Sequence, residues 1–506
     1  MVKTLMNSIY EFFVKRRLDQ MQPFIDHPVE VQNRLMLDLV YTARDTQIGR
    51  KYGFREIKKY EDFASRLPLC KYEDLCPSIE RMRRGEADVL WPGKVRWFAK
   101  SSATTNAKSK YIPITESCLD KCHYKAGKDM FAIYAHNHPD TKFFAGKNLR
   151  LGGSYRLYDY GTLYGDVSSI LVEHLPLWAE WRGTPSKKVV LMSDWESKLK
   201  AIVLEVVKQD VRSLVGVPSW MLVLLSKVME TSQKKYIDEV WPNLEVFFHG
   251  GVSFKPYIEQ YKNIFRKDIN YYDTYNASEG FFAIQDQKHS KELLLLLNHG
   301  IFYEFIPMEE LDSEFPPVLP IEKAQLNLNY AMVISTNTGL WRYIIGDTVK
   351  FTHLLPYRII ISGRTKHFIN TFGEELIVEN ADEALSKACK GTDSIVREYT
   401  AGPIYMTERS SGAHEWIIEF EKIPTDMSVF CDILDSTLQS LNSDYEVKRY
   451  NNMILLPPMI RIARKGLFYD WFKSCCKLGG QNKVPRLAND RTYLDILLQM
   501  NQNVFL

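Results

Sequence analysis

The chain has 506 residues, of which 45% are hydrophobic and 25% are charged, and its 65 lysines and arginines nearly balance its 62 aspartates and glutamates, which gives a formal net charge of +3. These values are typical of a folded globular protein, and the length predicts more than one domain. The small net charge argues against a nucleic acid or an acidic membrane as the partner, because proteins that bind them carry a strong basic excess. No feature of the sequence indicates an obligate protein partner.

The first hundred residues are expected to be mainly helical. An amphipathic helix is predicted near the start, with an apolar face that includes Leu5, Ile9, Phe12 and Phe13. We expect this helix to pack against protein, and a membrane-surface role is the alternative. The segment lacks the features of a signal peptide, and no run approaches the ~18 apolar residues that cross a bilayer. A cytoplasmic protein with reduced cysteines and no membrane association is therefore expected.

Strands and helices are predicted to alternate from about residue 95 onward. The predicted strands are at 95–99, 111–114, 189–192, 244–248 and 333–335. The predicted helices are at 117–136, 196–209 and 218–230. Alternation of this kind is typical of α/β layers.

Eight cysteines are present, and they form no paired C-x-x-C zinc pattern. Cys118, Cys122 and His123 together offer three metal ligands, but the sequence contains no second ligand cluster to accompany them. Their spacing is explained by one buried face of a helix, and we therefore expect a structural role for all three.

A domain boundary is predicted directly after the apolar run that ends near Gly363-Arg364. Beyond this point helical and strand patterns alternate over a stretch of ordinary domain size. We therefore expect a large N-terminal domain at 1–362 and a small C-terminal domain at 363–506.

Several common nucleotide-binding signatures are missing from the sequence. It contains no G-x-x-x-x-G-K-[ST] loop, no G-x-G-x-x-G fingerprint and no kinase motif set. A different polar segment, Lys100–Lys110, places five hydroxyls and three lysines between two predicted strands. Such a segment can present O–H, N–H and ammonium donors to a polyphosphate, although a solvated polar hairpin would have the same composition.

Three further polar segments carry side chains that suit nucleotide chemistry. Tyr272–Gly280 has a glutamate beside a serine at a strand end, where a carboxylate can hold Mg²⁺. Leu340–Asp347 ends in a carboxylate after a glycine turn, which suits the two hydroxyls of a ribose. Gly479–Arg486 contains a lysine flanked by glycines. Each segment is a weak signal by itself.

Together and in this order, the four segments resemble the motifs of the adenylate-forming superfamily of acyl-CoA synthetases, luciferases and adenylation domains. The closest resemblance is to the auxin-responsive acyl acid amido synthetases. Ser101–Lys110 follows that family's S-S-G-T-[ST]-x-G-x-x-K, and Tyr275–Glu279 follows Y-x-x-S-E. Trp341–Asp347 follows Y-R-Y-R-x-G-D, and Gln481–Arg486 follows Q-x-K-x-P-R. The resemblance spans nearly the whole chain.

The resemblance implies a fold and an activity. The fold is the α/β adenylate-forming fold, with a large N-terminal domain that binds ATP and the acyl acid and a small, mobile C-terminal α+β lid domain. The activity is that of an ATP- and Mg²⁺-dependent ligase that adenylates a carboxylic acid, releases pyrophosphate, and then transfers the acyl group to an amine such as an amino acid, releasing AMP.

The resemblance also implies a role for each matching residue. Contacts to ATP phosphates are implied for Ser101, Ser102, Thr104 and Thr105, and contacts near the adenine and α-phosphate for Tyr275 and Ser278. Coordination of Mg²⁺ is implied for Glu279, and ribose binding for Asp347. Gly363-Arg364 resembles the hinge, Lys483 the catalytic lysine that the lid delivers, and Lys366 a weaker phosphate contact.

Three positions depart from the family pattern. Ala103 and Ala107 replace the usual glycines of the phosphate loop, and Ile344 replaces an arginine. If either glycine position requires a positive φ, alanine costs roughly 1–2 kcal/mol, and the loop closes less readily on phosphate.

Two other functions compete with the amido synthetase. One is an acyl-CoA ligase that uses the same adenylation step, although the Q-x-K-x-P-R element favours the amido synthetases. The other is a degenerate binder of a nucleotide or acyl acid, against which the retained Glu279, Asp347 and Lys483 argue. The sequence does not identify the acid, whose pocket we expect in 120–180 and around Gly250-Gly251.

Overall fold

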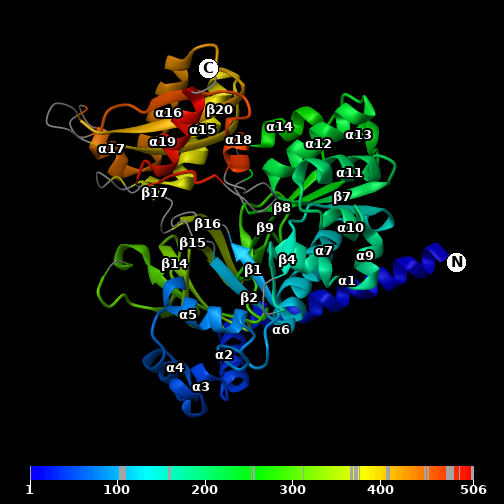
Figure 1. Ribbon diagram of the computed structural model, residues 1–506, viewed down its shortest axis with the longest axis vertical. Coiled ribbons are helices and arrows are strands. Elements are labelled where there is room, and N and C mark those ends of the chain that lie inside the picture. The colour runs from blue at the N-terminus through cyan, green and yellow to red at the C-terminus, as the bar shows by residue number, and fades with distance from the viewer. Residues whose placement is uncertain are drawn as a thin grey trace. The chain divides into compact units, whose positions relative to one another are not determined.

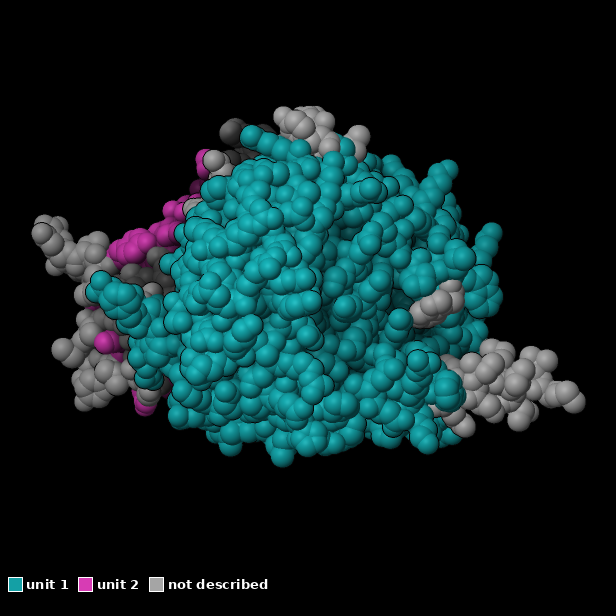
Figure 2. Space-filling view, turned by 90° about the horizontal axis from the view of Figure 1, so that it is seen from below, with its two compact units in different colours: residues 1–217, 224–251, 269–361 teal, residues 218–223, 252–268, 362–506 magenta. Residues whose placement is uncertain are grey.

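The computed structural model describes residues 2–101, 110–157, 161–251, 254, 257–311, 313–364, 368–369, 374, 376–405, 411–449, 452, 455–474, 484–488 and 490–502 (Figure 1). Contacts between Cα atoms divide the chain into two compact units, which Figure 2 colours teal and magenta. The first unit comprises residues 1–217, 224–251 and 269–361, and the second comprises residues 218–223, 252–268 and 362–506. The predicted roles of a substrate-binding domain and a lid domain remain predictions.

Helices form the start of the first unit. They are α1 (Val2–Asp26), α2 (Pro28–Ala43), α3 (Gln47–Lys51), η1 (Phe54–Glu56), α4 (Tyr60–Arg66) and α5 (Tyr72–Arg83). Arg17 on α1 donates through Nε to Asp129 Oδ1 over 2.7 Å, which ties this helix to α7 (Tyr124–Asn137). Phe12 keeps 66% of its surface exposed, so protein does not cover the whole of the predicted apolar face. Within the described part of the chain, no helix is long and apolar enough to span a bilayer.

A twelve-stranded sheet is the main feature of the first unit. Its strands, in spatial order, are β13 (Leu319–Pro320), β12 (Ile301–Pro307), β14 (Asn329–Thr336), β15 (Tyr343–Leu354), β16 (Tyr357–Arg364), β11 (Leu293–Leu295), β10 (Gly280–Ile284), β9 (Asn270–Ala277), β8 (Val246–Gly250), β7 (Val211–Gly216), β3 (Lys147–Arg150) and β6 (Gly183–Thr184). The pairs from β9 to β6 are parallel, and β9 pairs antiparallel with β10. The leucines of 293–297 are all buried, as expected for a central strand covered on both faces.

A smaller sheet and many helices complete the first unit. The smaller sheet has the order β2 (Lys110–Ile114), β1 (Trp97–Ser101), β5 (Leu163–Gly165) and β4 (Tyr155–Leu157). The helices are α6 (Glu116–Cys118), the π-helical turn η2 (Leu119–His123), α7, η3 (Phe143–Ala145), α8 (Val167–Glu173), α9 (Leu177–Arg182), α10 (Lys187–Val190), α11 (Trp195–Val206), α13 (Ile237–Val240), η5 (Met308–Glu310) and η6 (Ile321–Lys323). Helix α12 (Pro218–Ser232) begins in the second unit and ends in the first.

One predicted strand is wrong. Val189 and Val190 end helix α10 and Leu191 caps it, because the Ser186 carbonyl accepts hydrogen bonds from the amides of Val189 and Val190. A short apolar run does not distinguish a strand from a buried helical turn, and Val190 is fully buried in this turn. The other predicted strands and helices are present, with shifted ends.

The second unit is an α+β structure. Its three-stranded sheet has the order β19 (Ile395–Ile404), β20 (Ala413–Lys422) and β21 (Met459–Ala463), and β17 (Phe368–Ile369) pairs with β18 (Leu376–Ile377). Its helices are α14 (Ile258–Ile264), α15 (Val378–Thr392), α16 (Met427–Leu441), α17 (Ser443–Arg449), α18 (Leu467–Ser474) and α19 (Thr492–Gln502). The buried faces of α15 and α16 share a core with β19 and β20 that contains Leu385, Phe430 and Trp416.

Candidate active site

The predicted phosphate loop connects strands β1 and β2. These strands pair antiparallel, and their last pair in register is Ser101 with Lys110, so the two ends of the loop are adjacent. Ser102, Thr104 and Thr105 lie outside the described residues, and so do Ala103 and Ala107.

Lys110 is a residue to which the sequence assigned no role. Its ammonium donates to Tyr343 Oη over 3.2 Å. The same nitrogen lies 5.6 Å from the ring centroid of Tyr72 and 5.8 Å from that of Tyr343, within the range of cation–π attraction. The lysine at the end of the phosphate-loop segment is therefore held beside the third sequence motif.

The second motif lies on the β9–β10 hairpin. Ala277 pairs with Gly280, so Ser278 and Glu279 form a two-residue turn. Both turn residues are buried, at 7% and 6% exposure. A Cβ atom on Gly280 would lie 2.5 Å from the end of the Ile301 side chain, so a larger residue would require Ile301 to shift where the hairpin meets β12.

The third motif begins with a turn that Arg342 holds in place. Its guanidinium donates to both carboxylate oxygens of Glu304, over 3.0 and 3.1 Å. It also donates to the backbone carbonyls of Ala64 and Leu67 over 2.9 and 2.7 Å. The guanidinium is thus engaged in the protein interior, and we assign Arg342 a structural role that places Tyr343 next to it in the chain.

The same motif ends in a bulge that carries Asp347. The register of β14 and β15 shifts between Ala331 and Val333, and Gly346 within this bulge has a φ of 90°. Asp347 is buried at 6% exposure, and its Oδ2 accepts a hydrogen bond from Tyr275 Oη over 2.7 Å. The second and third motifs are therefore joined by a direct side-chain contact.

The charges of the two predicted carboxylates both reach the Tyr343 hydroxyl. Burial raises the pKa of Tyr343 well above its ordinary value, and the charges of Glu279 and Asp347 raise this pKa further. Tyr343 therefore keeps its proton while its oxygen accepts from the Lys110 ammonium. Buried carboxylate oxygens are the ligands that Mg²⁺ takes, and a cation offsets their charge, so this donor set fits Mg²⁺.

The fourth motif belongs to the second unit. Lys483 and Lys366 lie outside the described residues, and Gly363-Arg364 ends strand β16. The motif's last residue, Arg486, is paired with Glu398, and its side chain is only 11% exposed. It also donates to Tyr257 Oη over 2.7 Å, and its guanidinium carbon lies 4.6 Å from the ring centroid of Tyr399.

Backbone hydrogen bonds fix the same segment to strand β19. The Ala401 amide donates to the Arg486 carbonyl over 2.9 Å, and the Ala488 amide donates to the Ala401 carbonyl over 3.1 Å. The Thr400 hydroxyl donates to the Pro485 carbonyl. The chain that directly follows Lys483 is therefore rigidly attached to the sheet of the second unit.

The expected acyl-acid pocket remains a prediction. Strand β8 ends at Gly250, where a Cβ atom would lie 2.4 Å from the Thr274 carbonyl oxygen. Glycine is needed there because β8 and β9 approach closely.

Three family models match the chain, in order and over most of its length. The model of the GH3 family N-terminal domain matches residues 17–269, that of the central domain 294–364, and that of the C-terminal domain 379–492.

Curated relatives match nearly end to end. The chain is 21% identical to indole-3-acetic acid-amido synthetase GH3.6 of Arabidopsis thaliana, over 96% of this chain and 92% of that protein. It is 22% identical to 4-substituted benzoates-glutamate ligase GH3.12 of Arabidopsis thaliana, over 94% and 96%.

Solved structures show the same fold. AtGH3.15 acyl acid amido synthetase in complex with 2,4-DB matches with a TM-score of 0.80 at 16% identity, over 96% of both chains. A 2-hydroxyisobutyryl-CoA ligase in the postadenylation state, in complex with 2-HIB-AMP, matches with a TM-score of 0.59 at 13% identity, over 93% of this chain and 91% of the ligase. The predicted α/β adenylate-forming fold is confirmed.

Proposed function

Because the chain belongs to the GH3 family, we propose that it is an acyl acid amido synthetase that uses ATP to join a carboxylic acid to the amine of an amino acid. Its curated relatives are named for such reactions, with indole-3-acetic acid or 4-substituted benzoates as the acids and, in one case, glutamate as the partner. We place the reaction in the cytosol, as the sequence predicts.

The first step makes the acid reactive. A carboxylate is a poor electrophile, because attack on its carbon would have to expel an oxide. A carboxylate oxygen therefore attacks the α-phosphorus of ATP, the bond to the bridging oxygen of the β-phosphate breaks, and pyrophosphate leaves. Negative charge builds on the phosphate oxygens during this step, so positioned donors and cations lower its barrier.

The first unit provides such donors, and we propose that the second unit provides one more. Ser101, Ser102, Thr104 and Thr105 would contact the phosphates, and Lys110 would add a positive charge at the end of the loop. Tyr275 and Ser278 would lie near the adenine and α-phosphate, and Asp347, oriented by Tyr275, would bind the ribose. Lys366 is a weaker candidate, and Lys483 would reach the α-phosphate when residues 363–506 close as a lid over 1–362.

Glu279 would hold Mg²⁺, and the carboxylate of Asp347 would supply further negative charge nearby. When bound, Mg²⁺ acts as a Lewis acid that neutralises charge on the phosphate oxygens.

The second step forms the amide bond. The neutral nitrogen of the amine attacks the acyl carbon, the bond to the AMP oxygen breaks, and the nitrogen loses a proton. This step needs proximity, a deprotonated amine and exclusion of water rather than a nucleophilic side chain.

One observation supports this proposal most strongly. Side chains from three motifs that are far apart in sequence are joined by direct contacts, from Lys110 to Tyr343 and from Tyr275 to Asp347. A set of unrelated polar turns would have no reason to share one buried location.

An isotope-exchange assay tests the first step. With Mg²⁺, a suitable acid and labelled pyrophosphate, the protein should move label into ATP. A panel of aromatic and aliphatic acids would be screened, starting with indole-3-acetic acid and benzoates. Formation of ADP at any stage would contradict the proposal, because it would place attack at the γ-phosphate.

The acceptor is tested in a parallel assay. With the active acid, AMP release should be stimulated by an amino acid and should be accompanied by an acyl-amide of matching mass. Stimulation by coenzyme A, with a thioester as the product, would identify an acyl-CoA ligase instead. Nucleotide binding without exchange or AMP release for any acid would indicate a binding protein.

A further inference from the structure

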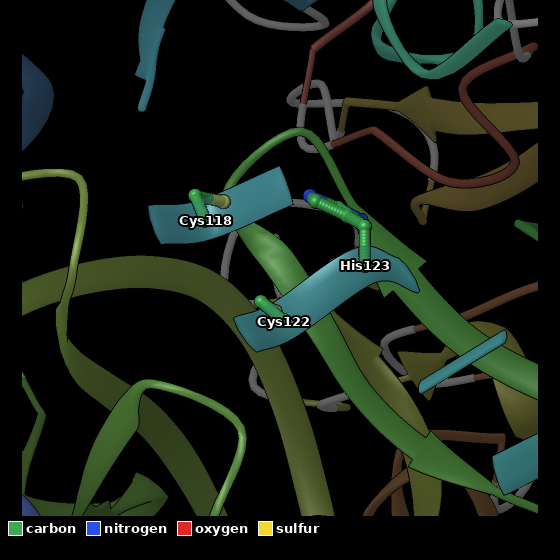
Figure 3. Close-up of side chains that lie close together, drawn as sticks. All are labelled: Cys118, Cys122 and His123. Atoms are coloured by element: carbon green, nitrogen blue, oxygen red, sulfur yellow. The ribbon is translucent and has the colours of Figure 1, made fainter. Parts of the chain in front are cut away.

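Cys118, Cys122 and His123 form a compact buried cluster in the first unit. Their ligand atoms all lie within 4.8 Å of one another. The side chains are 1%, 0% and 4% exposed. Figure 3 shows the Cys118 sulfur and the His123 ring directed toward one another.

The cluster exists because the helix widens at this point. At about 100° per residue, an α-helix would place positions 118 and 123 about 140° apart around its axis. Residues Leu119–His123 instead form the π-helical turn η2, whose wider spiral brings residue i+5 back toward residue i. A single buried face of a regular helix, as expected from the sequence, would not bring all three ligands together.

The buried imidazole of His123 lacks hydrogen-bond partners among the described residues. Among the residues that the structure describes, neither ring nitrogen of His123 has a hydrogen-bond partner, although the ring is buried. A neutral imidazole is the form that binds metal ions. A buried and unsatisfied imidazole requires a partner, and an ion is one of the few that fit.

The cysteines are arranged as metal-bound thiolates usually are. Cys122 Sγ accepts a hydrogen bond from the Phe281 amide over 3.2 Å, a contact that stabilises negative charge on sulfur. The Cys122 thiol donates a long hydrogen bond of 3.9 Å to the Phe281 carbonyl oxygen, which would be lost when the thiol ionises to bind a metal. Cys118 and Cys122 are both free cysteines.

We propose that Cys118, Cys122 and His123 bind one zinc ion at helix turn η2, beside the β9–β10 hairpin. The two thiolates carry two negative charges and the imidazole is neutral, so a divalent ion leaves the site uncharged. Copper(I) would leave a net negative charge in an apolar interior. Among divalent ions, thiolate and imidazole ligands favour zinc. Ionisation of the thiols releases two protons, and the three side chains supply three of the four ligands that zinc usually takes.

The location gives this ion a structural task. Phe281 follows Gly280 in strand β10, directly after the turn that carries Ser278 and Glu279. Zinc bonds to Cys122 would fix the sulfur atom that accepts the Phe281 amide hydrogen bond. They would therefore stiffen the hairpin close to the turn that holds two of the proposed active-site residues.

The test is metal content measured on the intact protein. Protein without a histidine tag, from zinc-supplemented cells, should contain about one zinc per chain by elemental analysis. Cys118→Ser/Cys122→Ser should reduce this to background, and Cys389→Ser/Cys431→Ser, which removes two half-buried cysteines of the second unit, should not. Substitution with cobalt should produce thiolate-to-cobalt charge-transfer absorption in the wild type and in the control variant.

If the double variant fails to fold, measurements on the wild-type protein alone test the zinc proposal. Wild-type protein with background zinc and without the cobalt absorption would overturn the proposal. So would a chain two hydrogens lighter under non-reducing conditions, because its cysteines would then form a disulfide. Chelation of the zinc should lower the thermal midpoint of the wild type by several degrees, and an unchanged midpoint would contradict the structural task.

Discussion

Replacing Arg486 by methionine removes the charge that anchors the segment after Lys483. Arg486 and Glu398 are 11% and 12% exposed, so the substitution leaves Glu398 buried without its cation. Removal of one partner of a buried ion pair typically costs about 3–5 kcal/mol. The Tyr257 hydroxyl also loses its guanidinium partner.

A matched control is available in the same unit. Arg449 and Asp435 form a pair of nearly equal burial, at 7% and 11% exposure, with hydrogen bonds of 2.7 and 2.8 Å. Arg449→Met should therefore destabilise the second unit by a similar amount. The control pair does not contact the segment that follows Lys483.

The two variants are expected to differ in catalysis. A shift of about 1 Å in a reacting group can cost about 10²-fold in rate. Arg486→Met should therefore reduce pyrophosphate exchange by about 10-fold to 10²-fold per folded molecule, and Arg449→Met should leave it near the wild-type value. Urea unfolding followed in parallel would give the folded fraction.

The pH dependence provides a second readout. Burial raises the pKa of Glu398 and Arg486 opposes this rise, so loss of Arg486 moves the folded-state pKa further above the unfolded value of about 4.3. Such a group contributes stability that is present below its unfolded pKa and is lost as the pH rises through the folded pKa. The stability deficit of Arg486→Met should therefore shrink as the pH falls toward about 5. Equal losses of exchange in both variants, or exchange within twofold of wild type in Arg486→Met, would refute the reasoning.

Three further predictions concern the proposed ATP contacts. Lys483→Ala should reduce adenylate formation by about 10²–10³-fold and leave amide formation from a supplied acyl-adenylate nearly intact, in paired single-turnover assays; equal losses in both would contradict its assignment to the first step. Ala103→Gly should raise kcat or lower the KM for ATP with little change in the KM for the acid, and a loss of stability alone would show that alanine is well accommodated. Tyr275→Phe removes a hydrogen bond of 2.7 Å to Asp347, worth about 1.5–3 kcal/mol, and should lower kcat/KM for ATP by at least about tenfold. Tyr303→Phe, a buried tyrosine of the same unit bonded to the Leu296 carbonyl over 3.4 Å, should not affect it.

Much of the candidate site was predictable because motifs are local. Ser278, Glu279 and Asp347 stand in short segments that are weak signals separately but are identified together by their order along the chain. Lys110 and Tyr343 lie in the same segments, but their contact joins residues 233 positions apart, and no spacing rule relates them. The signal that could have identified Lys110 is its position as the lysine at the end of the phosphate-loop segment.

The fold was predictable where periodicity persists over many residues. Alternating helices and strands indicated the α/β layers, whereas the four-residue run at 189–192 was too short to separate strand from helix. The π-helical turn at Leu119–His123 has no sequence period of its own, because it depends on how the helix packs. The contact of Tyr257 with the second unit includes a long-range hydrogen bond from Arg486, which the sequence pattern could not indicate.

The order of synthesis has a consequence for the second unit. Residues 252–268 emerge from the ribosome long before Glu398 and Arg486, the partners of Tyr257. At about 5–20 residues per second, the interval between residue 268 and residue 486 is about 11–44 s. During this time Tyr257, which is 1% exposed in the folded protein, lacks its Arg486 partner. A tyrosine from the middle of the chain therefore waits for a partner that is made 229 positions later, and a stop codon before residue 486 would affect packing far upstream of the truncation.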